Sequence, residues 1–205
     1  MKTADRRTRG RQRRRDALYA TAVDLFVERG FDSTTMDDIA ERADVARATV
    51  FNHFPRKAAF LDEWATRRRK RASAAAHADD LEGAPLRNVL TRYFTELCQI
   101  SQTSAASRLE TVALMSAAVH SINVLARSEL VTEISQFVDR ARARGEIAAR
   151  IAPMRVGRLL VASYVAVLTA WISAEPAPFD LAEEMVATLD LQLRGIMPPP
   201  GPPQR

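Results

Sequence analysis

The stretch from residue 35 to residue 57, TMDDIAERADVARATVFNHFPRK, constrains the fold more than any other part of the chain. Its first half predicts a short amphipathic helix, because four apolar residues share one face at helical spacing: Met36, Ile39, Ala40 and Ala43. Its second half predicts another short helix, which buries Val50 and Phe54 and ends before Pro55. Two short helices joined by a tight turn at residues 43–46 indicate a helix-turn-helix.

The ends and the outer face of this motif follow from individual residues. Thr35 is the expected N-cap of the first helix, and Asp38 three residues later completes a capping box. The exposed face of the second helix carries four side chains that form hydrogen bonds: Arg47, Thr49, Asn52 and His53. Such a face is typical of a recognition helix that lies in the major groove of DNA.

The composition favours a soluble, helical protein. Hydrophobic residues make up 47% of the 205 residues, whereas aromatic residues make up 6% and glycines number 7. This mix predicts an all-α fold. Cys98 is the single cysteine, which excludes an internal disulfide and a cysteine-based zinc site, and we expect no metal or cofactor.

The sequence also bears on localisation. The basic N-terminus lacks the apolar segment of a secretory signal. The longest apolar run, residues 159–172, is too short for a transmembrane helix. We therefore expect a cytoplasmic protein with no membrane partner.

The net charge of +5 is unevenly distributed along the chain. Residues 1–15 hold eight basic residues and one acidic residue, so this segment alone carries +7. A basic tail can be a solvated, disordered end. Beside a helix-turn-helix, an arginine-rich arm is better interpreted as a contact to DNA phosphates or to the minor groove. A second basic run, residues 67–71, fits either a solvated helix end or an auxiliary phosphate contact.

Helical periodicity continues through the rest of the chain, without strand-like alternation or internal repeats. We expect about nine helices, the best defined of which span residues 16–29, 105–119, 122–144 and 153–173. Gly30 and Gly145 are the expected residues just past two helix C-termini.

Three segments resemble the TetR family of bacterial transcriptional regulators: LYATAVDLFVERGFDSTT, MDDIAERADV and RATVFNHFPRKAAFL. The resemblance implies a homodimer of all-helical subunits, which represses transcription and leaves its operator when a small molecule binds. It also implies four parts of the chain. They are a disordered basic arm (1–15), a helix-turn-helix DNA-binding domain (16–61), a helical ligand-binding and dimerisation domain (62–197) and a disordered proline-rich tail (198–205).

The resemblance also assigns roles on the DNA-binding surface. Arg47, Thr49 and Asn52 would face base edges or phosphates, and His53 would contact the DNA backbone. Lys57 would hold a phosphate together with the N-terminus of the following helix. The complete expected DNA-binding set is Arg13, Arg14, Thr35, Arg47, Ala48, Thr49, Phe51, Asn52, His53 and Lys57.

Three positions depart from the family pattern. Asp44 stands where the turn often has glycine, although aspartate tolerates the left-handed conformation better than most residues. Ala46 stands where serine often caps the recognition helix, and the missing cap should cost about 1 kcal/mol. Phe51 replaces a tyrosine whose hydroxyl commonly reaches a phosphate.

Candidates for an effector site and a dimer interface lie in the C-terminal part. The possible ligand contacts are Trp64, Tyr93, Arg108, Met115, His120, Tyr164 and Trp171, each of which can equally be an ordinary core or surface residue. The few aromatic residues and interior charges favour an apolar ligand, and Cys98 is most simply a small core residue rather than a redox sensor. The expected interface, a four-helix bundle between two copies, contains Leu160, Val161, Val165, Leu168, Met185, Leu189 and Leu193.

Two other classes of function compete with a ligand-responsive repressor. An architectural DNA-binding protein without an effector would use the arm for low-specificity binding. An enzyme is not expected, because the sequence has no glycine-rich phosphate loop and no nucleophile motif. Whether a regulator of this kind represses or activates depends on where its operator lies.

Overall fold

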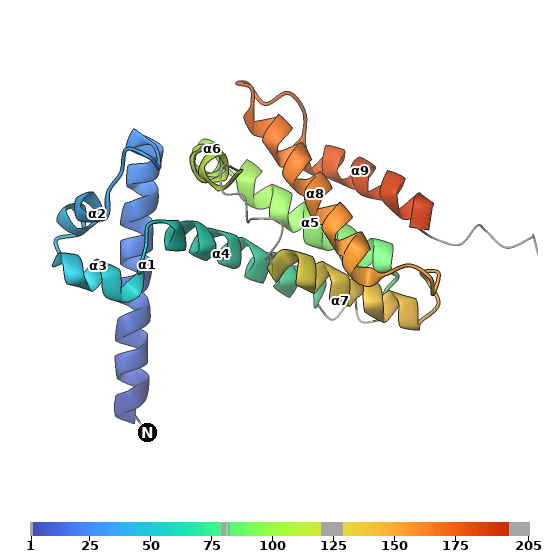
Figure 1. Ribbon diagram of the computed structural model, residues 1–205, viewed down its shortest axis with the longest axis horizontal. Helices are drawn as coiled ribbons and strands as arrows, with labels where there is room; N and C mark the ends of the chain where they lie inside the picture. Colours follow the sequence, from blue (N-terminus) through green and yellow to red (C-terminus); the bar gives the residue numbers. More distant parts are fainter. Residues whose placement is uncertain (1, 79–80, 82, 120–128, 197–205) are drawn as a thin grey trace, which may run out of the picture. The chain divides into compact units, whose positions relative to one another are not determined.

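The computed structural model describes residues 2–78, 81, 83–119 and 129–196, and these residues contain nine α-helices and no strand (Figure 1). The helices are α1 (Lys2–Arg29), α2 (Met36–Arg42), α3 (Arg47–His53), α4 (Ala58–Ala76), α5 (Leu86–Gln102), α6 (Ala105–Val119), α7 (Glu129–Ala143), α8 (Pro153–Ile172) and α9 (Leu181–Ile196). The predicted all-α fold is confirmed. The predicted tail, and the start of the helix expected at residues 122–144, lie outside the described residues.

The chain forms two compact units, and their boundaries differ from the expected ones. The first unit comprises residues 1–67 and 105–120, and the second comprises residues 68–104 and 121–205. The boundary therefore falls inside α4, and α6 packs with the N-terminal helices rather than with the C-terminal ones. Sequence periodicity defines α6 as a helix but does not say against which neighbours it packs.

The first unit is built around phenylalanine side chains from several elements. Phe26 of α1 lies with its ring centroid 4.9 Å from that of Phe31 and 5.9 Å from that of Phe60 in α4. Phe54, which follows α3, stacks on Phe60 at 3.9 Å. These contacts and the complete burial of Val50 fix the recognition helix α3 against α1 and α4.

Helix α1 begins much earlier than predicted. A disordered arm was expected over residues 1–15, but the helix runs without a break from Lys2 to Arg29. Arginine, lysine, glutamine and alanine are good helix formers, and the segment contains no proline. The prediction of a disordered arm was therefore wrong for the residues that the structure describes. The predicted C-terminal end is confirmed, because Gly30 follows α1 with φ +85°.

The second unit packs α5, α7, α8 and α9 around a shared core. Helices α7 and α8 approach closely at Gly157, where an added Cβ would lie 2.2 Å from Ser135 Oγ and 2.9 Å from the Val131 carbonyl oxygen. Glycine is therefore required for this crossing. Two further predictions hold here, since Pro153 opens α8 and Asp180 accepts the Glu183 backbone N–H at the start of α9.

The expected dimer-interface residues are mostly interior residues of a single chain. Six of them are buried: Leu160, Val161, Leu168, Met185, Leu189 and Leu193. Val165 is partly exposed. The periodicity located the apolar stripes of α8 and α9, but it does not distinguish burial within one chain from burial against a second copy. The prediction that these six side chains meet a partner was therefore wrong.

Among the described helices, α8 has the length and hydropathy of a possible membrane span. Seven of its residues are buried within the chain, including Tyr164 and Trp171. A core helix of a folded domain has the same properties.

Candidate DNA-binding interface

Helix α2, the first helix of the helix-turn-helix, is bounded by a local motif at each end. The Thr35 hydroxyl accepts the Asp38 backbone N–H at 3.1 Å, and the Asp38 carboxylate accepts the Thr35 N–H at 2.7 Å, so the predicted capping box is present. At the other end of α2, Asp44 adopts φ +51°. The Val45 N–H then donates to the Ala40 carbonyl at 3.0 Å, which closes a Schellman motif. The aspartate therefore takes the left-handed position that glycine often fills.

Helix α3 starts without a side-chain cap and ends where predicted. Ala46 occupies the N-cap with φ −62° and ψ 141° and makes no capping hydrogen bond. Phe54 takes an extended conformation after His53, and its N–H donates to the Val50 carbonyl at 2.8 Å. Pro55 follows directly, as expected for a helix that stops before proline.

The outer face of α3 is open and polar. Arg47, Ala48 and Asn52 are exposed, and Thr49, Phe51 and His53 are partly exposed. The Arg47 side chain is 67% exposed, and its Nε lies 3.0 Å from Asp37 in α2. Its guanidinium carbon lies 5.3 Å from the centroid of the Phe51 ring. Phe51 thus supports Arg47 by a cation–π contact, and the phenylalanine needs no hydroxyl for that.

Lys57 has a different role from the expected one. Its Nζ donates to the backbone carbonyls of Phe31, Asp32 and Thr34 at 2.7, 3.2 and 3.0 Å. An ammonium group has three donors, and these three bonds use all of them. Lys57 therefore ties the loop between α1 and α2 to the start of α4, and the prediction that it holds a phosphate does not fit this geometry. Its acceptors lie 23 to 26 residues away, beyond the reach of local sequence patterns.

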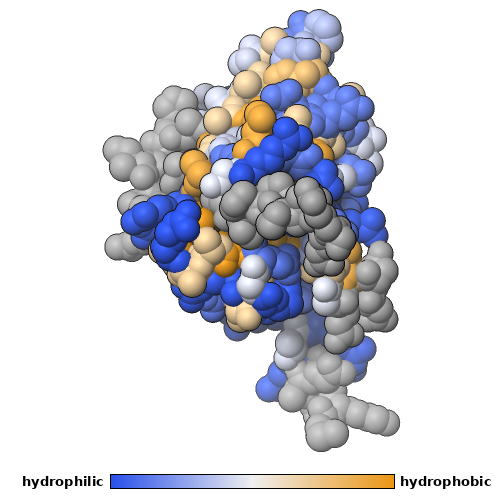
Figure 2. Space-filling view, turned by 90° about the vertical axis from the view of Figure 1, so that its right-hand side faces the viewer, coloured by the Kyte–Doolittle hydropathy of each residue, from blue (hydrophilic) through white to orange (hydrophobic). Residues whose placement is uncertain are grey.

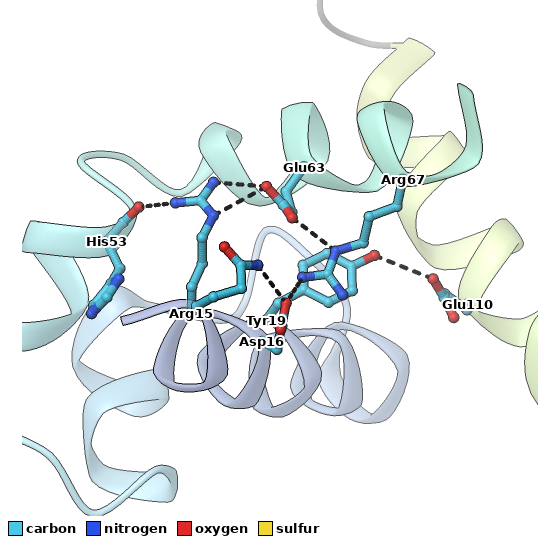
Figure 3. A network of polar contacts seen from close by, with 8 residues as sticks. Arg15, Asp16, Tyr19, His53, Glu63, Arg67 and Glu110 are labelled. Carbon is cyan, nitrogen blue, oxygen red and sulfur yellow. Dashed lines mark hydrogen bonds and ion pairs between the residues drawn. The ribbon is translucent and has the colours of Figure 1, made fainter. Parts of the chain in front are cut away.

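Arg15 connects three helices at the C-terminal end of α3 (Figure 3). Its guanidinium donates to the His53 carbonyl oxygen and forms an ion pair with Glu63 of α4 at 2.7 Å. The same guanidinium lies 4.1 Å from the centroid of the Phe54 ring. Arg15 therefore satisfies a carbonyl at the end of α3 and holds that end against α1 and α4.

The same network continues from Glu63 to α6 (Figure 3). Arg67 donates to Glu63 at 2.8 Å, pairs with Asp16 and lies 4.1 Å above the Tyr19 ring. The Tyr19 hydroxyl donates to Glu110 of α6 at 3.4 Å. Burial, followed by the charge of Glu110, raises the pKa of Tyr19, so the phenol stays protonated as a donor. The chain of contacts thus joins the recognition helix to α4 and α6, which the sequence alone did not indicate.

The basic segment of α1 is exposed. Arg13 and Arg14, both expected to contact DNA, have exposed side chains on the helical part of α1 that precedes Arg15. Figure 1 shows α1 continuing past α3 towards the N-terminus. The arm is therefore an extension of the first helix rather than a flexible tail.

As a whole, the second basic run, residues 67–71, fits neither the expected solvated helix end nor the expected phosphate contact. Arg69 pairs with Glu129 and Glu133, and Arg71 pairs with Glu96. Arg68 is 6% exposed, which is unusual for arginine. Arg69 and Arg71 stabilise the second unit through carboxylates of α5 and α7, whereas Arg68 donates to the Leu97 carbonyl and to the Ser101 and Tyr164 hydroxyls. Sequence spacing could not reveal these partners.

The expected ligand contacts do not gather at one site. Trp64, Arg108 and Met115 belong to the first unit, whereas Tyr93, Tyr164 and Trp171 belong to the second. His120 lies outside the described residues. A cavity of about 430 Å³ in the second unit lies between His77, Leu86, Phe137 and Arg140, and none of the six described candidates lines it.

Two aromatic candidates do share a cluster in the second unit. The ring of Phe94 lies 5.9 Å from that of Tyr93 and 5.9 Å from that of Tyr164. Arg68 donates to Ser101 Oγ at 2.7 Å and to the Tyr164 hydroxyl at 3.3 Å. The interior of this unit therefore combines apolar rings with a cation and two hydroxyls.

Cys98 is fully buried beside this cluster. Burial raises the pKa of its thiol to about 12, so the reactive thiolate is scarce at neutral pH. This supports the interpretation of Cys98 as a core residue. Within the described residues, no group of three or more His, Cys, Asp or Glu side chains is arranged to hold a metal ion.

An all-helical chain whose first unit exposes a polar recognition helix belongs to the helix-turn-helix class of DNA-binding proteins. A family model described as "Bacterial regulatory proteins, tetR family" matches residues 18–64. Residues 18–64 therefore form a TetR-type DNA-binding domain, and the chain resembles transcriptional regulators of that family along most of its length.

Relatives along the whole chain agree with this assignment. The transcriptional repressor KstR of Rhodococcus jostii is 28% identical over 185 residues, which are 89% of this chain and 84% of that protein. The crystal structure of Thermus thermophilus FadR with lauroyl-CoA matches with a TM-score of 0.70 and 26% identity, over 93% of this chain and 100% of that one. NalD of Pseudomonas aeruginosa, at 22% identity, matches in fold with a TM-score of 0.64, over 91% and 98% of the two chains. These relatives are regulators rather than enzymes.

Proposed function

We propose that two copies of this chain repress transcription from an operator and that a small, largely apolar molecule releases them. The observation that carries this proposal is the open polar face of α3, held in place from α1 and α4. We expect the protein to act in the cytoplasm, where the bacterial chromosome is accessible. The similarity to KstR, a transcriptional repressor, favours repression over activation.

Base recognition is assigned to Arg47 and Asn52. Arginine binds guanine O6 and N7 with two hydrogen bonds, and asparagine similarly brackets adenine. The ion pair between Arg47 and Asp37 is exposed, so little free energy holds Arg47 there and DNA can displace the carboxylate. Thr35, Ala48, Thr49 and His53 border this face and are proposed to contact phosphates or sugars.

Dimerisation is assigned to the outer faces of α8 and α9. Leu159 of α8 is 50% exposed and Leu191 of α9 is 70% exposed, and Ala162, Ala166 and Ala187 are also exposed on these helices. Figure 2 shows orange apolar side chains among blue hydrophilic ones on one face of the molecule. Small and apolar residues on two adjacent helices suit an isologous four-helix contact with a second copy.

The effector is assigned to the interior of the second unit, with α4, which continues from the first unit into the second, as the link to α3. FadR, which resembles this chain along its length, was crystallised with lauroyl-CoA. The Tyr93, Phe94 and Tyr164 rings provide apolar walls here. The contacts from Glu110 through Arg67 and Glu63 to Arg15 favour coupling, because a shift of α4 or α6 would disturb the end of α3.

The test is release of DNA from the purified protein. An operator duplex, selected from a random pool, is labelled and bound, and lauroyl-CoA is titrated with free coenzyme A as the control. We expect lauroyl-CoA to release the duplex and coenzyme A to leave it bound. If neither releases it, the effector is not a fatty-acyl thioester of the kind crystallised with FadR. If deletion of the gene lowers transcription from the operator, the repressor assignment is wrong.

A further inference from the structure

The basic part of α1 presents its arginines on two different faces. An α-helix turns by about 100° per residue, so residues three or four apart share a face. Two sets of arginines follow this spacing: a basic ridge of Arg7, Arg11 and Arg14, and an outer set of Arg6, Arg9 and Arg13. The centres of the two sets lie roughly 130° apart around the helix axis. Equal charge is thus presented in two directions.

The basic ridge continues the stripe by which α1 packs into the first unit. Leu18 and Leu25 of this stripe are each 1% exposed. Arg11 precedes Leu18 by seven residues, which is about two helical turns, and Arg7 precedes it by about three turns. The buried side of α1 therefore becomes the arginine-bearing side as the helix extends towards its N-terminus.

This side of α1 faces the recognition helix. Arg15, one turn after Arg11, donates to the His53 carbonyl oxygen at the end of α3. The pKa of the His53 imidazole is lowered, first by burial and then by charged neighbours. These neighbours are Arg11, Arg15 and Arg14 of α1. The guanidinium groups of the ridge nearest to α3 therefore stand beside the DNA-reading face.

The ridge carries charge that no carboxylate of the described residues compensates. Five arginines of the first unit pair with carboxylates: Arg15, Arg42, Arg47, Arg56 and Arg67. Within the described part of the chain, no hydrogen bond or ion pair joins the side chains of the ridge to another residue. Three exposed cations along one face repel one another, and a polyanion would relieve that repulsion.

We propose that Arg7, Arg11 and Arg14 bind backbone phosphates of the same DNA duplex that α3 reads. The outer set points away from that duplex, so Arg13, expected from the sequence to contact DNA, is not among the proposed contacts. The ridge spans seven residues of helix, or about 10 Å, which equals the rise of roughly three base pairs along the duplex axis. The helix fixes the three guanidinium groups relative to α3, so the ridge positions the recognition helix as well as attracting DNA. The inference rests on the DNA-binding function of the chain.

Two full-length triple variants test the proposal: R7A/R11A/R14A in the ridge and R6A/R9A/R13A in the outer set. Both remove three charges and three helix-forming arginines, so each is the control for the other. Affinity for a random-sequence 30-base-pair duplex is measured between 50 and 300 mM KCl by fluorescence anisotropy. Circular dichroism at 222 nm checks that both variants keep their helix content. Binding by the unaltered protein tests the DNA-binding function itself.

The ridge variant should lose at least tenfold in affinity at about 100 mM KCl, and its plot of log K against log salt should flatten by about 2.7 for each chain that contacts the duplex, or about 5.4 for a dimer. The outer-set variant should flatten by less than about 1. The lysine variant R7K/R11K/R14K should retain most of the slope, because phosphate binding needs charge at these positions. Equal losses in both alanine variants would overturn the assignment to one face. Unchanged binding in the ridge variant would show that the ridge does not touch DNA.

Discussion

Adding the missing cap at Ala46 should stabilise the recognition helix. Ala46 already has the extended backbone of an N-cap, so a serine there needs no change of main chain. The Thr49 N–H donates to the Ala46 carbonyl at 2.8 Å, while the first N–H groups of α3 lack an acceptor within the helix. A seven-residue helix has little stability of its own, so one added hydrogen bond should stabilise it measurably.

The expected gain for Ala46→Ser is about 1 kcal/mol in the free energy of unfolding. For a chain of this length, the melting temperature should rise by about 2–4 °C. Urea unfolding followed by circular dichroism, without DNA, measures the change. The absence of DNA matters because a new hydroxyl at this position could also contact a phosphate.

Two matched variants calibrate this measurement. Ala48→Ser places the same hydroxyl two residues inside the helix and should lose about 0.5 kcal/mol. Thr35→Ala removes the existing cap of α2 and should lose about 1 kcal/mol. If Ala46→Ser is no more stable than Ala48→Ser while Thr35→Ala loses stability, the reasoning about the vacant cap is refuted.

Three further changes test other parts of the account. Burial raises the pKa of Glu63, but hydrogen bonds from two arginines outweigh this effect and leave the pKa below its ordinary value of 4.5. The ionised carboxylate therefore stabilises the fold above about pH 4.5, and this stabilisation is lost as the pH falls further. Glu63→Gln should therefore be less stable than the unaltered protein at pH 7, with a difference in urea midpoint that shrinks below pH 4.5; a constant difference would contradict the argument. Lys57→Met should lower the free energy of unfolding by about 1–3 kcal/mol and leave the salt slope of DNA binding unchanged. If Lys57 instead bound a phosphate, the substitution would lower the salt slope without affecting stability. Leu191→Glu should raise the dimer dissociation constant, measured by sedimentation, at least tenfold, which corresponds to about 1.4 kcal/mol of binding free energy. The control Leu109→Glu, at an exposed leucine of α6, should leave the constant unchanged. If the dimer survives Leu191→Glu, the interface lies elsewhere.

Local chemistry made the turn and the helix ends predictable. The capping box of Thr35 and Asp38, the left-handed Asp44 and the stop before Pro55 each involve residues within four positions of one another. Their geometry depends on backbone conformation and hydrogen bonds that the sequence specifies directly. The exposed Ala46 cap position without a capping bond was expected from the resemblance to the TetR family, in which serine often stands there.

Long-range partners were beyond this reasoning. Lys57 has the charge of a phosphate ligand, and only the fold brings three carbonyls to it. The link from Arg15 to Glu63 joins residues 48 positions apart. The sequence located the apolar stripes of α8 and α9. A period of 3.6 residues shows that one face of a helix is apolar, but not whether the same chain or a second copy covers that face.

Selection of bound duplexes from a random pool, followed by affinity measurements at about 150 mM salt, tests the central claim most directly. The account predicts an inverted repeat, because a two-fold dimer presents α3 to two half-sites. It also predicts at least about 10³-fold tighter binding to the selected duplex than to random sequence. A pool without a consensus, or equal affinity for both duplexes, would show a low-specificity DNA-binding protein instead of a sequence-reading regulator.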